Sequence, residues 1–331
     1  MRFLIIGLGS MGKRRIRCLK SLGHNEIYGF DIKLNRINEC EKKYKIYPLT
    51  NYKSLLKKNF FDASFICTDP LFHFKYSKEV ILSKTNCFVE ASVANRNKLM
   101  SLKKIISKHN LVYAPSCTMR YYPLPVEIFK NISKLGKLIY LNYHVGQYLP
   151  DWHPWEDYKS FYVSRKSTGA VRELIPFELN WINFLLGNPK IINCFKSKIG
   201  NLPINIDDIY IFTLQYPFKV IVNITIEVHS RPLATRKLTA IGSSGKLTFD
   251  NDNQIIKIYS VKESNNKIIK LKKSKIEKNY INPEEPYINE VKDFIKSIKS
   301  NNKFKFPTNL EWDLNLLKIL DNLDKISNFS K

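Results

Sequence analysis

The residues with the clearest chemical meaning are three glycines near the amino terminus. They form a Gly-x-Gly-x-x-Gly motif that directly follows the apolar run at residues 3–6 and precedes apolar residues at helical spacing. A tight turn, a close approach of a ligand to the backbone and close packing of helix on strand each need a residue without a side chain. The free N–H groups at the start of a helix attract phosphate. The motif therefore predicts a dinucleotide site, with expected contacts at Gly7, Gly9, Ser10, Met11 and Gly12.

A carboxylate stands where the second strand of such a site would end. Residues 26–31 have strand character and end in Asp31, about 20 residues beyond the last glycine. An acid at this place hydrogen-bonds the ribose hydroxyls of NAD and repels the 2′-phosphate of NADP. The nearby cations Lys33 and Arg36 keep NADP as an alternative. The competing interpretation of Asp31 is a turn acid at the end of a strand.

A second group of candidate residues lies between residues 143 and 158. This stretch contains two histidines, three acids, two tryptophans and three tyrosines. Aromatic faces beside carboxylates are suited to stacking on sugar rings and hydrogen-bonding them. A loop that packs at a domain or subunit interface would have the same composition. The residues of interest for ligand contact are Tyr148, Asp151, His153 and Trp155.

Two arginines are candidates for binding a phosphate or carboxylate group. The planar guanidinium groups of Arg120 and Arg172 have the geometry for bidentate contacts with such anions. The alternative for each is a salt bridge to a neighbour such as Glu178. Two polar residues nearby are further candidates for substrate contact, namely Tyr121 and Asn180.

The elements that would position the amino-terminal candidates alternate regularly along the chain. Three further segments have the apolar composition of buried strands: 63–68, 86–90 and 111–116. Helical stretches separate them, which predicts a doubly wound parallel sheet. Ligands bind at the carboxyl ends of such strands. We therefore expect cofactor contacts at Thr68, His73 and Glu90, with capping of the next helix as the alternative for His73.

After residue 119 the pattern changes to strands in succession. The expected strands are 138–145, 191–198, 209–216, 218–228, 238–241 and 246–249. A helix is predicted at 171–186, with Pro176 interrupting its start, and two amphipathic helices end the chain. The predicted fold is α/β: a Rossmann domain over residues 1–119, then an α+β domain over residues 120–331 with a mostly antiparallel open sheet.

Composition limits the partners of the chain. The 331 residues contain 54 Lys and Arg against 29 Asp and Glu, a formal net charge of +25. The cations are mostly lysines spread along the chain, whereas nucleic-acid readers concentrate basic residues and use arginine for base edges. The densest run, at 262–278, is expected to be a solvated surface hairpin with an anion-attracting patch as the alternative. We expect no nucleic-acid partner.

The chain also has no features of a membrane, secreted or metal-binding protein. No apolar run approaches the roughly 18 residues that a membrane-spanning helix needs, and the amino terminus does not resemble a signal peptide. The six cysteines are scattered without a Cys-x-x-Cys pair, so we expect neither disulfides nor a metal site. A cytoplasmic location is predicted.

Five segments together resemble the Gfo/Idh/MocA oxidoreductases, the family of glucose–fructose oxidoreductase and inositol dehydrogenase. They are GLGSMG at 7–12, CTDPLFHF at 67–74, VEASVA at 89–94, CTMRYYP at 117–123 and TGAVRELIPFELNWINFLLG at 168–187. The resemblance covers essentially the whole chain. It implies bound NAD or NADP, a sugar, cyclitol or nucleotide-sugar substrate, and an open sheet that often forms the oligomer contact. It also places the 143–158 loop near the substrate.

The chain departs from the family at the two positions that usually handle protons. The family's Glu-Lys-Pro is here Glu90-Ala91-Ser92, and its histidine four residues after an acid is here Phe177, after Glu173. Oxidation of an alcohol needs a base for the hydroxyl proton, and neither alanine nor phenylalanine titrates. Four groups are candidates to replace the pair: His144, His153, Glu173 and Tyr121. We expect Glu173 and His153 to do so.

Three functions follow from these observations. The first is an NAD(P)-dependent oxidoreductase, acting as a homo-oligomer on a hydroxyl or carbonyl of a sugar phosphate or nucleotide sugar. Surface glycan biosynthesis is the setting that the resemblance suggests. The second, indicated by Ala91 and Phe177, is a non-catalytic sensor or scaffold that binds the cofactor. The third is a nucleic-acid-binding protein, which the dispersed charge disfavours.

Overall fold

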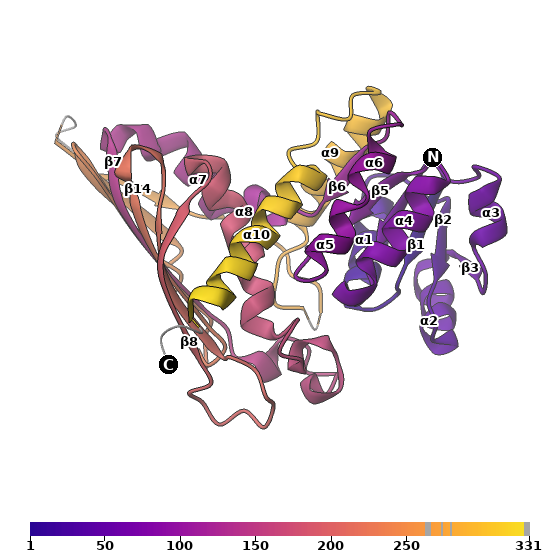
Figure 1. The fold of residues 1–331 in the computed structure, drawn as a ribbon, viewed down its shortest axis with the longest axis horizontal. Coiled ribbons are helices and arrows are strands. Elements are labelled where there is room, and N and C mark those ends of the chain that lie inside the picture. Colours follow the sequence, from indigo (N-terminus) through magenta and orange to yellow (C-terminus); the bar gives the residue numbers. More distant parts are fainter. Residues whose placement is uncertain (262–265, 273, 279, 328–331) are drawn as a thin grey trace. The chain divides into compact units, whose positions relative to one another are not determined.

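The computed structural model describes residues 1–261, 266–272, 274–278 and 280–327, and it divides into two compact units (Figure 1). The first unit comprises Met1–Thr118 and Pro283–Leu317, and the second comprises Met119–Asn282 and Lys318–Lys331. The chain leaves the first unit next to the boundary expected at residue 119. It then returns to that unit at Pro283, although the sequence assigns residues 283–317 to the second domain.

The first unit contains a six-stranded parallel sheet in the order β3-β2-β1-β4-β5-β6. Its strands are β1 (Phe3–Ile6), β2 (Ile27–Phe30), β3 (Tyr47–Leu49), β4 (Ala63–Ile66), β5 (Asn86–Val89) and β6 (Tyr113–Pro115). The intervening helices are α1 (Ser10–Ser21), α2 (Leu34–Tyr44), α3 (Lys53–Lys57), α4 (His73–Leu82), α5 (Arg96–Met100) and α6 (Lys103–Ile106). This order is the doubly wound Rossmann arrangement, whose direction of winding reverses between β1 and β4. The predicted fold class of this unit is confirmed.

Helix α9 (Glu285–Lys299) completes the first unit because its apolar side chains pack on the sheet and its Glu290 pairs with α1. Tyr287, Val291 and Phe294 are buried, and Phe294 meets the rings of Phe65 and Phe88 on the sheet. Ion pairs join Arg14 and Arg15 of α1 to acids of the returning segment. Such contacts between distant segments cannot be inferred from local periodicity, which explains the different domain assignment.

The second unit contains an eight-stranded sheet in the order β14-β13-β12-β11-β7-β10-β9-β8. Its strands are β7 (Leu138–Gly146), β8 (Lys190–Ser197), β9 (Ile209–Gln215), β10 (Ile221–Glu227), β11 (Thr235–Gly242), β12 (Gly245–Asp250), β13 (Ile255–Ser260) and β14 (Lys267–Lys270). Among the described strands of this second sheet, only β7 and β10 pair in parallel. The mostly antiparallel sheet is confirmed.

One face of this sheet is covered by helices and the other is open (Figure 1). Helices α7 (Pro123–Asn131) and α8 (Ala170–Leu186) lie against the covered face (Figure 1). In β10, buried Val222, Ile224 and Ile226 alternate with more exposed residues. This period of two gives each strand one apolar face for the helices. Helix α10 (Leu310–Ser327) begins in the first unit and ends in the second.

Two local predictions in the second unit are wrong in detail. Helix α8 starts at Ala170 and continues through Pro176, whose missing N–H would be expected to weaken it. Burial of most of the helix offsets that loss. The strand predicted from residue 218 begins only at Ile221, because Pro217–Lys219 forms a 3-10 turn with Phe218 at φ 60°.

The lysine-rich run at 262–278 lies partly outside the described residues. Strands β13 and β14, which flank residues 262–265, pair antiparallel, as the predicted hairpin requires. Within the described part of the chain, no helix combines the length and apolar character needed to cross a membrane.

Candidate functional site

The glycine turn between β1 and α1 has a geometry that other residues would not fit. Gly7 has φ +93°, and a Cβ there would lie 2.6 Å from the carbonyl oxygen of Cys67. A Cβ on Gly12 would lie 1.9 Å from the carbonyl oxygen of Gly7. These two glycines are therefore required by the turn itself and by the packing of α1 on the strand.

Gly9 differs, because the protein leaves room for a side chain there. A Cβ on Gly9 would meet only the side chain of Arg36, at 3.5 Å, which is an ordinary contact. Gly9 is also the N-cap of α1, with φ −71°, and no side chain caps the helix. Ser10 and Met11 form the first turn of α1 directly after it. The open backbone at the helix N-terminus fits a dinucleotide, whose diphosphate needs this close approach.

Asp31 is fixed at the carboxyl end of β2. Its side chain is buried, Oδ2 accepts the backbone N–H of Leu8 at 2.7 Å, and Oδ1 accepts that of Lys33 at 2.9 Å. A carboxylate oxygen can accept a second hydrogen bond, so these contacts leave capacity for a ribose hydroxyl. The guanidinium of Arg36 lies 3.7 Å from Oδ2, and this cation next to Gly9 keeps NADP as an alternative to NAD.

The remaining cofactor candidates lie at the ends of β4 and β5. His73 is buried, its Nε2 lies 3.1 Å from the carbonyl oxygen of Thr68, and burial lowers the pKa of its imidazole. This contact joins the first residue of α4 to the loop after β4. Glu90 follows β5 directly and accepts two hydrogen bonds from Arg15. The sequence offers no reason to single out Arg15, because it lies among other basic residues of the same predicted helix.

In the second unit, Glu173 and His153 belong to one chain of contacting side chains. The hydroxyl of Tyr162 donates to Glu173 Oε1 at 2.9 Å, and the rings of Tyr162 and Phe161 lie 5.6 Å apart. The His153 ring lies 5.9 Å from that of Phe161 and 5.2 Å from that of Trp155. Phe161 and Tyr162, which come just after the 143–158 loop, therefore link both predicted proton-transfer residues. Tyr162 was not anticipated.

Other residues of the 143–158 loop make packing contacts, which also support the interpretation of this loop as one that packs at an interface. Trp155 packs on Tyr280 with ring centroids 5.6 Å apart. Arg231 lies over the Tyr148 ring at 3.9 Å and 3.7 Å from Asp151, and both charged side chains are more than half exposed. Arg231 thus connects Tyr148 and Asp151, two of the predicted substrate residues. Nothing in the sequence pattern singles it out.

Arg120 and Asn180 lie together. Arg120 is buried in the 3-10 turn Thr118–Tyr121, which also carries Tyr121, and its Nε donates to Asn180 Oδ1 at 2.8 Å. Its guanidinium lies 4.3 Å from the centre of the Phe184 ring. These contacts fix the direction of the guanidinium, which suits a group that binds an anion.

Arg172 makes salt bridges, which were the alternative to binding an anion. Its guanidinium donates to Asp324 and lies 3.4 Å from Asp321, both in α10. The salt-bridge alternative therefore holds, although not with the expected partner. Glu178 instead pairs with Arg236 at 2.7 Å and accepts a hydrogen bond from Tyr143.

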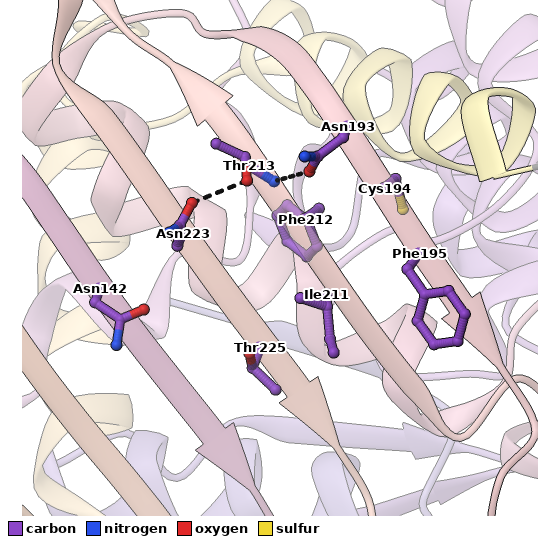
Figure 2. A pocket seen from close by; sticks show the side chains of 9 residues that line it. All are labelled: Asn142, Asn193, Cys194, Phe195, Ile211, Phe212, Thr213, Asn223 and Thr225. Carbon is purple, nitrogen blue, oxygen red and sulfur yellow. Dashed lines mark hydrogen bonds between the residues drawn. The ribbon is translucent and has the colours of Figure 1, made fainter. Parts of the chain in front are cut away.

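The open face of the second sheet carries a polar row across four strands (Figure 2). Asn142, Asn223, Thr213 and Asn193 are register partners, and Thr213 hydrogen-bonds both neighbouring asparagines. These side chains line a shallow hollow of about 470 Å³ together with Phe195 and Ile211. Among the described residues, no cluster of His, Cys, Asp and Glu side chains is arranged to hold a metal ion.

Comparison with known proteins agrees with both units. Residues 1–115 match the family model described as "Oxidoreductase family, NAD-binding Rossmann fold", and residues 132–248 match that of the GFO/IDH/MocA C-terminal domain. The chain belongs to the GFO/IDH/MocA family. Its amino-terminal unit is therefore an NAD-binding Rossmann domain, and NAD is the cofactor that the glycine turn and Asp31 fit.

The match to one curated relative covers a much shorter segment of the chain. The uncharacterized oxidoreductase YrbE of Bacillus subtilis is 27% identical over 122 residues, which is 36% of each chain. The match thus spans about a third of that protein.

Solved structures of the same fold cover nearly the whole chain. A levoglucosan dehydrogenase in complex with NADH has a TM-score of 0.84 at 12% identity, covering 99% of this chain and 97% of its own. UDP-N-acetylglucosamine 3-dehydrogenase GnnA from Acidithiobacillus ferrooxidans has a TM-score of 0.78 at 15% identity, covering 100% and 99%. An Agrobacterium radiobacter oxidoreductase in complex with NAD+, L-tartaric acid and magnesium reaches 0.86 at 11% identity, covering 100% and 97%. At these identities the likeness establishes the fold alone.

Proposed function

We propose that the protein is an NAD-dependent oxidoreductase that interconverts a hydroxyl and a carbonyl group on a sugar derivative. The observation that carries the proposal is the turn at Gly9. The packing of the protein leaves room for a side chain at this position, whereas a closely bound diphosphate would leave none. Bound nicotinamide would supply or accept the hydride. A sugar phosphate or nucleotide sugar is the substrate class we propose, because Arg120 offers a fixed guanidinium to an anionic group.

The proton of the reacting hydroxyl needs a titratable residue of this chain. By the resemblance to the family, Ala91 and Phe177 stand where a lysine and a histidine are usual, and neither side chain titrates. Glu173 is in the first turn of α8, and the Tyr162 hydroxyl holds one of its oxygens. We assign Glu173 as the proton-transfer residue, with His153 as the second member of the pair.

The test is to follow the absorbance of NADH and NADPH with a panel of sugar phosphates and nucleotide sugars. With the active substrate, Glu173→Gln should lower kcat by about 100-fold, the usual effect of losing a general acid–base group. Asp157→Asn, which changes an acid that caps a turn in the same loop, should leave kcat unchanged. Full activity in both Glu173→Gln and His153→Ala would refute the assignment.

A non-catalytic cofactor-binding protein is the second candidate function, and the substitutions at Ala91 and Phe177 favour it. It predicts tight NADH binding without hydride exchange on any sugar in the panel. If the chain has only lost the family's chemistry, Ala91→Lys combined with Phe177→His should create activity on a family substrate. If Glu173 has replaced that chemistry, the double variant should be no better than the native chain.

We further propose that a second copy of the chain covers the open face of the eight-stranded sheet. Phe195 and Ile211 are 52% and 44% exposed on this face, next to the polar row of Figure 2. We expect Ile211→Asp to shift the mass measured by light scattering from oligomer to monomer. Phe218→Asp, at an exposed turn away from the hollow, should not. A monomeric native chain would contradict the proposal.

A cytoplasmic location and a role in glycan biosynthesis stay predictions.

A further inference from the structure

A buried arginine connects the phosphate-binding helix to the opposite half of the Rossmann sheet. Arg15 is in α1, one turn after the glycine motif, and its side chain is 0% exposed. Its Nε and Nη2 donate to the two oxygens of Glu90 at 2.6 and 3.0 Å, and its Nη1 donates to Glu290 at 2.8 Å. We call Arg15, Glu90 and Glu290 the Arg15 clamp.

The clamp is built to hold one geometry. A guanidinium and two carboxylates are desolvated together, which is favourable only with good hydrogen-bond geometry. The flat faces of Arg15 meet the rings of Phe88 at 4.5 Å and Tyr287 at 5.3 Å. Burial alone would lower the pKa of Arg15, but the two carboxylates outweigh that effect and raise the pKa above its usual value. The group is therefore a permanent cation.

Glu290 extends the clamp to the end of β6. Its Oε1 accepts hydrogen bonds from the Ser116 hydroxyl at 3.0 Å and from the backbone N–H of Cys117. Its Oε2 accepts the Thr118 hydroxyl at 2.6 Å. One carboxylate of α9 thus fixes the three residues that follow β6.

The clamp therefore sets the carboxyl ends of β5 and β6 relative to α1. In a sheet of this order, the two mononucleotide halves of the cofactor bind on either side of the point where the winding reverses, between β1 and β4. Asp31 at the end of β2 marks the side of the adenosine half. The ends of β5 and β6 lie on the other side, which receives the nicotinamide half.

We propose that Arg15 and Glu290 are positioning residues for the nicotinamide half of the cofactor. They act by fixing Glu90 and residues 116–118, and neither side chain needs to touch the cofactor. The proposal rests on NAD binding and not on the identity of the substrate. It predicts that disrupting the clamp weakens the binding of NADH while leaving intact the binding of ADP, which has the adenosine and the diphosphate but no nicotinamide nucleoside.

The experiment compares dissociation constants for NADH and ADP, measured by calorimetry, in Arg15→Gln and in the native protein. NADH should bind about tenfold more weakly, a loss of about 1.4 kcal/mol, because the ends of β5 and β6 are no longer held, and ADP should bind as before. Arg15→Lys, which keeps the charge without the bidentate contact, should fall between the two.

Arg17 provides a matched control on the same helix. It is paired with Glu284 of the returning segment at 2.9 Å, away from the strand ends. Arg17→Gln therefore removes a comparable ion pair, and both dissociation constants should stay unchanged. If Arg15→Gln does not fold, Glu290→Gln, which preserves the shape of the side chain, is measured against the same criteria.

Two results would overturn the proposal. Equal weakening of NADH and ADP binding would mean that the clamp only stabilises the fold. Unchanged NADH binding in a folded clamp variant would mean that the strand ends are positioned without it. A native protein that binds no NADH would instead refute the proposed function itself.

Discussion

Replacing Gly9 with alanine is expected to remove NADH binding while leaving the first unit folded. A Cβ at this position meets only the flexible Arg36 side chain, at 3.5 Å, and the backbone φ of −71° suits alanine. The methyl group would instead occupy the space that the cofactor diphosphate needs. We expect the dissociation constant of NADH to rise at least about 100-fold with an unchanged melting temperature, measured by calorimetry and thermal unfolding.

Two other glycines make this result interpretable. Gly12→Ala should lower both the melting temperature and the affinity, because its Cβ would lie 1.9 Å from the backbone of Gly7. Gly23→Ala should affect neither binding nor fold beyond about 1 kcal/mol, since nothing lies within 4 Å of its Cβ and only its φ of +83° is unfavourable. Native affinity in Gly9→Ala would show that the diphosphate does not approach this turn.

Replacing Asp313 with asparagine is expected to stabilise the protein above pH 7. Asp313 is in the first turn of α10 and is 4% exposed. Its Oδ2 has no hydrogen-bond partner among the described residues. Burial raises the pKa of this carboxyl group from 3.8 to about 7.

The direction of the effect follows from proton binding. Between pH 4 and 7 the native state keeps a proton that the unfolded chain has released, so stability falls as the pH rises. Above pH 7 the accumulated loss is on the order of 4 kcal/mol, and asparagine, which has no proton to release, avoids it. Unfolding midpoints of the native protein and Asp313→Asn should therefore nearly coincide at pH 4.5 and diverge by pH 8.

Asp252→Asn is the control for this comparison, since Asp252 is exposed. Its unfolding curve should follow that of the native protein at both pH values. A constant difference between Asp313→Asn and the native protein across this range would mean that Asp313 is already ionised in the folded state.

The sequence predicted the elements whose signals are local. The turn at residues 7–12 and the end of β2 at Asp31 follow from spacing, because the backbone geometry of a dinucleotide turn depends on neighbouring residues. The alternation of apolar and polar residues in β10 likewise predicts directly that one face of the strand is buried. Helix α8 was located to within one residue, but the interruption expected at Pro176 is absent, because burial of the helix outweighs the local effect of the proline.

The parts that were not predicted depend on distant residues. The local sequence around Arg172 is compatible with an anion-binding residue, but its acidic partners are 149 and 152 residues away in the chain. Arg15 resembles a surface cation of α1, and its burial is decided by Glu290, 275 residues later. Contacts between distant residues also explain why the fold class was predicted correctly while residues 283–317 were assigned to the second domain.

The return of α9 to the first unit also bears on how the chain is made. Domains usually fold from the amino terminus as they leave the ribosome. Here Arg14, Arg15 and Arg17 emerge early, but their acidic partners on the returning segment, Glu284 and Glu290, emerge only after the entire segment Met119–Asn282. The amino-terminal unit is therefore completed only late in synthesis, and a fragment that stops at Thr118 would lack its closing layer.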